Sequence, residues 1–252
     1  MITVSIATSR PERRLSAAVR PTPPEDHEHR DVSGGWLRPT VFGAMDGLVT
    51  NVSLIAGVGG GGLDRSRIIL TGLAGLVAGA FSMATGEFTS VTSQNELVRA
   101  EVELERQQLA AYPQEEQAEL AEAFAEKGVD PELAGQIAEQ VSQDPEEALR
   151  LHAQEELGVD PHELPSPVVA AVSSFLSFGI GAVVPLLSFL LGSSSLYLAL
   201  GIAAVALFVL GAVVAKLTRV NTLYGAVRQL LLAGVAAGVT YTVGRAIGAS
   251  VS

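Results

Sequence analysis

The sequence predicts an all-α integral membrane protein that has five transmembrane helices and an acidic helical insert between the second and the third. Composition is the first observation: 48% of the 252 residues are hydrophobic and only 17% are charged, whereas about a quarter of an average soluble domain is charged. The second observation is that charge is segregated. Nineteen of the 27 acidic residues lie between positions 95 and 163, together with only four basic residues. The apolar remainder therefore has the character of a membrane domain.

Five apolar blocks account for this membrane domain. Each has about the 20 residues that a helix needs to cross about 30 Å of hydrocarbon. Glycine pairs four residues apart, Gly75 with Gly79 and Gly234 with Gly238, would let neighbouring helices approach closely. The blocks are residues 41–58, 68–91, 168–191, 196–215 and 223–247.

Basic residues predict the orientation of these spans. Six arginines, ending at Arg38, precede the first span, and Lys216 and Arg219 follow the fourth. Because loops rich in arginine and lysine face the cytoplasm, the N-terminus and the insert are predicted to be cytoplasmic. The preference for arginine over lysine and the abundant alanine indicate a GC-rich bacterial source, and hence a bacterial plasma membrane.

Four regions follow from the composition. Residues 1–36 contain four prolines and almost no apolar periodicity, which predicts a disordered tail. Residues 37–93 hold spans one and two, residues 94–164 form the cytoplasmic acidic helical domain, and residues 165–252 hold spans three to five. Inside the insert, the first helix is expected to continue the second span to Ala111. Further helices are expected over 114–127, after Asp130-Pro131, and from Asp144-Pro145 to Leu157, with Asp as N-cap and Pro at the first helical position.

Several function classes are excluded by what the sequence lacks. The chain has no cysteine, which excludes disulfides, cysteine-ligated zinc and thiol catalysis. It contains no phosphate-binding loop, dinucleotide fingerprint or serine-hydrolase elbow. No basic patch with interleaved aromatic residues suggests nucleic acid as a partner. The chain is therefore not expected to be an enzyme or a nucleic-acid-binding protein.

Carboxylates inside two apolar blocks are the first candidate functional residues. Asp46 lies in the first block and Glu87 in the second, and a carboxylate within a membrane span is costly and usually functional. Met83 precedes Glu87 by four residues and so shares a helix face with it, while Asn51 follows Asp46 by five. A carboxylate with a thioether suits Fe²⁺ or Mn²⁺ better than Mg²⁺ or Ca²⁺. The competing interpretation is a hydrated interfacial carboxylate beside a methionine that only packs.

The insert supplies a second set of candidate metal ligands. Its acidic residues recur at spacings of three or four, and one histidine stands four residues before a glutamate, so each group shares a helix face. Carboxylates and imidazole on facing helices are typical of non-haem iron sites, and the insert is therefore predicted to bind metal. Glutamate-rich helices that are simply solvated are the alternative. The candidate ligands are Glu101, Glu105, Glu116, Glu119, His152 and Glu156.

Two of these segments resemble signatures of the vacuolar iron transporter family. The sequence Asp-Gly-Leu-Val-Thr-Asn at 46–51, with glycines after it, resembles the family's first span, and Ser-Met-Ala-Thr-Gly-Glu-Phe at 82–88 resembles its second. The Glu-rich helix after Ser93-Gln94 and the sequence Glu-Glu-Leu-Gly at 155–158 are similar to its cytoplasmic metal-binding insert. The resemblance covers residues 37–248, and the chain would be a bacterial-type member.

This resemblance implies a transporter that exports Fe²⁺, often also Mn²⁺, from the cytosol in exchange for protons, working as a homodimer in a lipid bilayer. It implies pathway roles for Asp46 and Met83, with Glu87 close by. It also implies metal ligation by Glu105, Glu116, Glu119 and Glu156. His152 stands where plant members have methionine, and Gln108 stands where a further glutamate is expected, for which Glu101 is a substitute one turn earlier.

Two other classes stay open at this point. One is a membrane-tethered iron-binding or sensing protein, in which the spans only anchor the insert; the carboxylates within the spans argue against it. The other is a ferroxidase acting in the insert. A single His-x-x-Glu motif disfavours it, since a ferritin-like di-iron site would carry two.

Overall fold

A computed structural model describes residues 35–251, and these residues are entirely helical or irregular, with no strand. Residues 1–34, where the disordered tail is predicted, lie outside the described part. Five helices are long and apolar enough to cross a membrane, as the sequence predicts. They are α1 (Leu37–Gly60), α2 (Arg65–Ala111), α6 (Pro167–Leu190), α7 (Leu196–Leu217) and α8 (Thr222–Val251).

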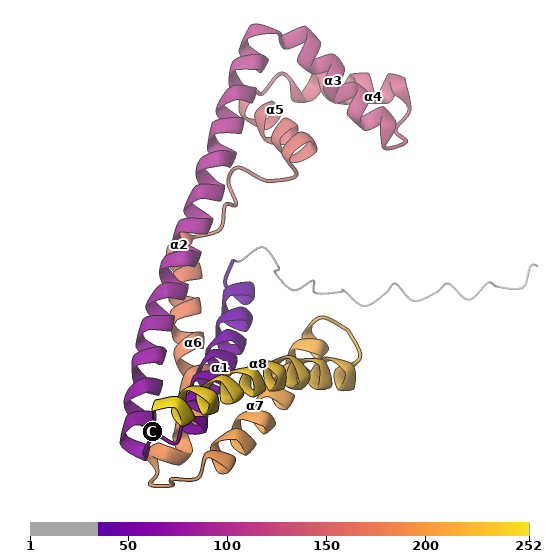
Figure 1. The fold of residues 1–252 in the computed structure, drawn as a ribbon. Coiled ribbons are helices and arrows are strands. Elements are labelled where there is room, and N and C mark those ends of the chain that lie inside the picture. Colours follow the sequence, from indigo (N-terminus) through magenta and orange to yellow (C-terminus); the bar gives the residue numbers. More distant parts are fainter. Residues whose placement is uncertain (1–34, 252) are drawn as a thin grey trace, which may run out of the picture. The chain divides into compact units, whose positions relative to one another are not determined.

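Helix α1 is the centre of the membrane domain, because it packs against each of the other four long helices (Figure 1). On one side Leu48 and Val52 join a buried cluster with Ala203, Leu207 and Ala233 of α7 and α8. On another, Ile55 packs with α2, α6 and α7. The membrane domain is therefore built on the segment that carries Asp46 and Asn51.

Glycines set the distance between α1 and α6. A Cβ added at Gly47 would collide with the backbone of Phe178, and one added at Gly181 would collide with the carbonyl oxygen of Ala44. The two backbones are thus in direct contact at the level of Asp46. By contrast, Gly234 and Gly238 of α8 face open space in this chain, so the predicted packing role of that pair is not fulfilled within one chain.

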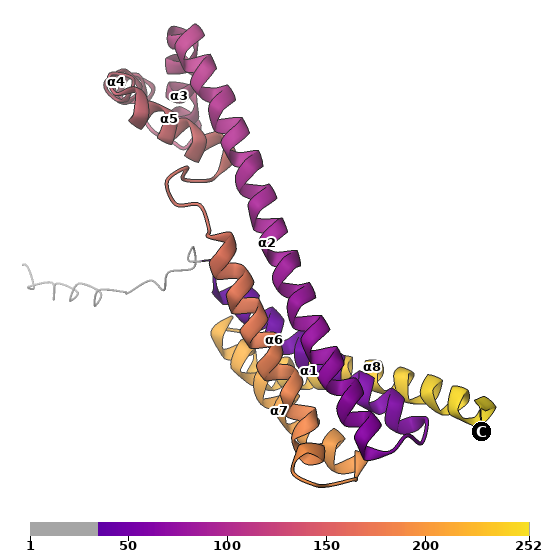
Figure 2. The same ribbon diagram turned by 90° about the vertical axis from the view of Figure 1, so that its left-hand side faces the viewer.

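Helix α2 is continuous over 47 residues and belongs to both parts of the chain (Figure 2). Its first half packs against α1 and α6, whereas its second half contacts α3, α5 and the turn that follows α5. At 1.5 Å per residue, it is about 70 Å long. The expectation that the first insert helix continues the second span to Ala111 is confirmed.

Three short helices complete the insert; the first and the third of them contact the second half of α2, and the second packs mainly against the first. They are α3 (Pro113–Glu126), α4 (Pro131–Val141) and α5 (Pro145–His152), followed directly by a π-helical turn, η1 (Ala153–Leu157). Asp130 and Asp144 cap α4 and α5 by accepting backbone N–H bonds, and a proline follows each cap. The caps were predicted; the helix expected to run unbroken to Leu157 instead widens into the π turn after His152.

Candidate metal site

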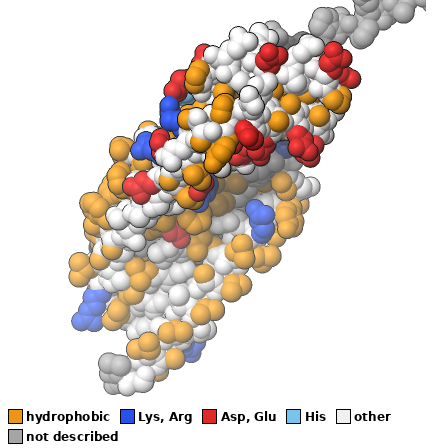
Figure 3. Space-filling view, turned by 90° about the horizontal axis from the view of Figure 1, so that it is seen from above, with side chains coloured by type: hydrophobic (Ala, Val, Ile, Leu, Met, Phe, Trp, Pro, Cys, Tyr) orange, Lys and Arg blue, Asp and Glu red, His pale blue; other side chains and the backbone are white. Residues whose placement is uncertain are grey.

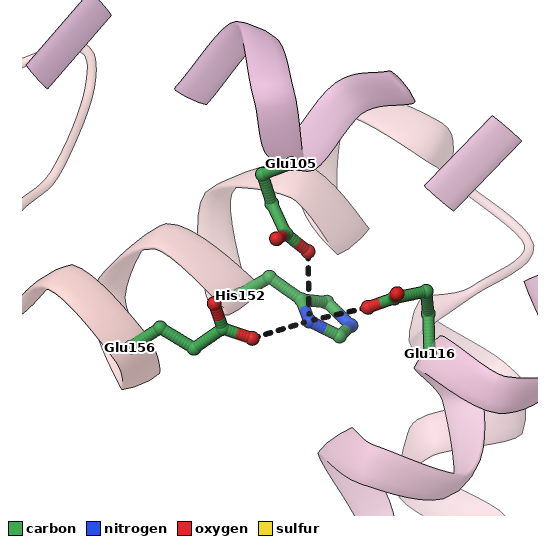
Figure 4. A group of neighbouring side chains, drawn as sticks. All are labelled: Glu105, Glu116, His152 and Glu156. Carbon is green, nitrogen blue, oxygen red and sulfur yellow. Dashed lines mark ion pairs between the residues drawn. The ribbon is translucent and has the colours of Figure 1, made fainter. Parts of the chain in front are cut away.

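Four side chains predicted as ligands meet in the insert (Figure 4). His152 lies at the end of α5, and its Nδ1 faces carboxylates from three different elements. The nearest is Glu105 of α2, with Oε1 3.1 Å from Nδ1. Glu156 of η1 follows at 3.6 Å and Glu116 of α3 at 3.8 Å. One imidazole and three carboxylates thus converge on a single point.

Burial makes this cluster different from a solvated acidic face. His152 is 1% exposed, Glu105 5% and Glu116 7%, while Glu156 lies at the open side with its side chain 40% exposed. Buried carboxylates are costly unless they are paired, hydrogen-bonded or bound to a metal. Yet Glu105 Oε1 and His152 Nε2 are buried without a hydrogen-bond partner. The proximity of Glu105 Oε1 to Nδ1 is therefore not a hydrogen bond.

The donor atoms also have suitable separations for a shared cation. Nitrogen and oxygen ligands lie about 2.0–2.2 Å from a first-row divalent metal, so neighbouring ligand atoms lie about 3.0–3.5 Å apart. The distances from Nδ1, 3.1 to 3.8 Å, are close to this range. One nitrogen and three oxygens suit Fe²⁺, Mn²⁺ or Zn²⁺ rather than a soft metal. The residues therefore fit a divalent transition metal.

The same crowding changes the acidity of two ligands. Burial, together with the nearby charges of Glu156, Glu116 and Glu119, raises the pKa of Glu105 to about 7. Burial also raises the pKa of Glu116, with a contribution from Glu119, against which His152 acts. Glu105 is therefore partly protonated near neutral pH, and a bound cation would expel that proton.

Two predicted ligands lie outside the cluster. Glu101 and Glu119 are exposed, and neither belongs to the group of four. Glu119 acts on the cluster only through its charge. Gln108 is exposed as well. Their assignment as metal ligands stays a prediction that the geometry of this single chain does not favour.

Acidic side chains gather around the cluster on the surface of the insert. The view along α2 from the insert end shows them over the insert helices (Figure 3). The insert contributes nineteen acidic residues and only four basic ones. The negative potential of these acidic residues concentrates cations near the site. In the same view, hydrophobic side chains cover much of the membrane domain.

The candidate residues of the membrane domain are arranged less tightly. Asp46 is half-buried and accepts a hydrogen bond from Thr50 at 3.3 Å. Glu87 is 8% exposed, and its Oε2 has no partner. Met83 packs beside Phe178 and Ala182. Within residues 35–251, no hydrogen bond or ion pair joins these side chains to one another.

Asn51 has a structural role that the sequence did not indicate. It is 1% exposed, and its Nδ2 donates a hydrogen bond to the carbonyl oxygen of Ala182 in α6. Its Oδ1 is buried without a partner. The amide therefore ties α1 to α6 one turn from Asp46, and a pathway role for Asn51 stays a prediction that rests on its free oxygen.

Fold and site together define a helical membrane protein with five apolar spans and a candidate divalent-metal site outside them. The sequence model of the VIT family matches residues 37–245. The chain belongs to the VIT family.

Named relatives match most of the chain. Vacuolar iron transporter 1 of Oryza sativa subsp. japonica is 27% identical over 227 residues, which cover 88% of this chain and 90% of the relative. Vacuolar iron transporter of Acanthamoeba castellanii is 34% identical, with 87% and 82% covered. VIT-like transporter 1b of Glycine max is 33% identical, with 90% and 83% covered. These relatives confirm the predicted family and the class, a membrane transporter rather than an enzyme.

Proposed function

We propose that this protein is a proton-coupled exporter of Fe²⁺, with Mn²⁺ as a second substrate, that moves the ion out of the cytosol across a bacterial plasma membrane. The observation that carries the proposal is the cluster of Glu105, Glu116, His152 and Glu156, whose ligand atoms converge on one point where Glu105 Oε1 is buried without a hydrogen-bond partner. Relatives named iron transporters support Fe²⁺ as the substrate.

The insert would act first, as the site of capture. Its acidic surface attracts divalent cations, and the cluster binds one of them with a nitrogen and three oxygens. Because burial raises the pKa of Glu105 to about 7, an ion that binds near neutral pH displaces a proton. Capture and proton release are therefore linked at this site.

The membrane domain would act second, as the route. Asp46 and Met83 would receive the ion, and Glu87, whose Oε2 is buried without a partner, would hold either the ion or a proton. A carboxylate that loses a bound cation gains proton affinity, so exchange of Fe²⁺ for protons is the natural coupling. The pathway would lie between two copies of the chain in a homodimer.

Transport by purified full-length protein tests this proposal. Proteoliposomes that hold wild-type protein should take up Fe²⁺ faster under an imposed pH gradient, and the lumenal pH should change as they do so. The Asp46→Asn variant, which keeps the size of the side chain, should lose most of the flux.

Matched controls separate the two parts of the proposal. Asp64→Asn removes an exposed carboxylate at the start of α2 and should leave the flux unchanged. Full flux in Asp46→Asn would contradict the pathway assignment. Metal binding without any flux in wild-type vesicles would favour the membrane-tethered binding protein instead.

A further inference from the structure

The π turn after His152 separates two neighbouring glutamates. Glu155 and Glu156 follow His152 at positions three and four, so in a regular α-helix both would flank the face of the imidazole. In η1 the helix is wider, because its hydrogen bonds span five residues instead of four. Glu156 remains at the metal cluster, whereas Glu155 does not belong to it. Helices with π turns often carry functional residues at that point.

Glu155 instead forms an ion pair with Lys127. Lys127 directly follows α3 as its C-cap, and the next residue, Gly128, has a φ of 91°. The ion pair therefore connects the end of α3 with η1. These two elements supply Glu116 and Glu156 to the cluster, and the carboxylate of Glu155 is only 19% exposed.

A second set of contacts holds the other end of the turn. Asp160 accepts a hydrogen bond from Gln154 at 2.9 Å and lies 3.8 Å from Arg150. Gly158 ends the turn with a φ of 68°, a conformation that glycine adopts without strain. The contacts of Asp160 and the ion pair of Glu155 with Lys127 therefore hold η1 from two directions.

We propose that Lys127 is a positioning residue for the metal cluster: it holds Glu155 away from the cluster and so makes Glu156 the ligand that η1 supplies. This inference rests on the proposed metal binding by the insert. Without Lys127, Glu155 loses its ion-pair partner and stands directly before Glu156 in the chain, as a second carboxylate that η1 could turn toward the cluster. The ligand set then changes, and the cation is held less well.

Simple electrostatics predicts something different, which makes the proposal testable. If Lys127 acted only through its charge, removing it would strengthen cation binding, and removing the charge of Glu155 would weaken it. If the ion pair positions η1, Lys127→Ala and Glu155→Gln both weaken binding. An exchange of the two residues, Lys127→Glu with Glu155→Lys, keeps the net charge and restores the pair.

Binding of Mn²⁺ to the full-length protein in detergent, followed by electron paramagnetic resonance, measures this. We expect Lys127→Ala and Glu155→Gln each to weaken binding about three- to tenfold, and the exchanged double variant to recover most of the loss. Arg99→Ala and Glu139→Gln remove the same charges from exposed positions of α2 and α4 and serve as matched controls. The spectrum of bound Co²⁺ should change in Lys127→Ala and return in the exchanged variant.

Three outcomes would overturn the inference. Tighter binding in Lys127→Ala would show a purely electrostatic role. Unchanged affinity and an unchanged Co²⁺ spectrum would show no role at all. Failure of the exchanged variant to recover, with helical content equal to wild type by circular dichroism, would show that the pair does not position η1. Absence of Mn²⁺ binding in wild-type protein would instead contradict the proposed function.

Discussion

At the scale of single residues, the cluster is defined by His152, which is the one ligand with a nitrogen atom and the most buried of the four. Its Nδ1 lies between 3.1 and 3.8 Å from three carboxylates. Imidazole in place of a thioether makes the site harder, which favours Fe²⁺, Mn²⁺ and Zn²⁺ over Cu⁺. In the proposed capture step, metal selectivity would therefore depend on His152 more than on any single glutamate.

Substitution of Glu105 tests the composition of the cluster. Glu105→Gln replaces a buried ligand oxygen by an amide and should weaken Mn²⁺ binding by at least tenfold, since it removes one of three carboxylates around the ion. Glu101→Gln, one turn earlier on the same helix and exposed, should change binding less than twofold. Titration calorimetry on the full-length protein distinguishes them. Equal losses of Mn²⁺ affinity in the two variants would indicate that Glu101 is also a ligand.

Acidity at Glu105 predicts a pH dependence of binding. Its pKa is about 7, raised mainly by burial, and that of Glu116 is raised too. Below pH 7 the ion must displace the proton of Glu105, so affinity should rise about tenfold between pH 6 and pH 8 and level off above pH 8. Calorimetry in buffers of different ionisation enthalpy counts the protons. Equal affinity at pH 6 and pH 8 would contradict this expectation.

The sequence predicted all four side chains of the cluster as ligands, but it did not separate them from Glu101 and Glu119. The spacing of His152 and Glu156 on one helix is readable directly, because positions four apart share a face. The meeting of Glu105 with Glu116 is not, because it depends on the turn at Tyr112 that folds α3 back against α2. The proposed positioning role of Lys127 could not be predicted from the sequence, because it depends on the π turn that brings Glu155 to Lys127.

At the scale of helices, the contact between α1 and α6 depends on the absence of side chains. Gly181→Ala would push a methyl group into the carbonyl oxygen of Ala44 and should destabilise the protein by about 1–3 kcal/mol. Gly179→Ala, two residues away on α6, meets nothing within 4 Å and should be neutral or slightly stabilising. Thermal unfolding in detergent compares the two, and equal melting temperatures would refute the close contact.

Helix ends were more predictable than helix interiors. Asp130-Pro131 and Asp144-Pro145 mark the starts of α4 and α5 because a cap and a fixed φ are local properties. The change from α to π geometry after His152 has no such local signal, and it coincides with the ion pair of Glu155 with Lys127, which lies 28 residues earlier in the chain.

At the scale of the whole molecule, the five spans follow from hydropathy alone, because a helix that satisfies its own backbone is one of the few structures stable in hydrocarbon. The side on which the insert lies follows from the distribution of basic residues. The way in which two copies of the chain would pack together, by contrast, cannot be predicted from hydropathy.

The lack of native cysteine allows a clean test of orientation. Gln140→Cys places a thiol on an exposed face of α4 in the insert, and Ser194→Cys places one in the exposed loop between α6 and α7. A membrane-impermeant maleimide added to intact cells should label the second and not the first, because the two are predicted to lie on opposite sides of the membrane. Labelling of Gln140→Cys from outside would reverse the predicted orientation.

The continuity of α2 would link the proposed capture site mechanically to the proposed transport route. Eighteen residues separate Glu87 from Glu105 on this helix, which is about five full turns and about 27 Å. Glu87 and Glu105 therefore lie on the same face of α2. Any rotation of α2 about its axis would turn both by the same angle. Insertion of one residue between Glu87 and Glu105 would rotate one carboxylate by about 100° about the helix axis relative to the other. Insertion of eighteen residues, which is about five full turns, would return both carboxylates to the same face.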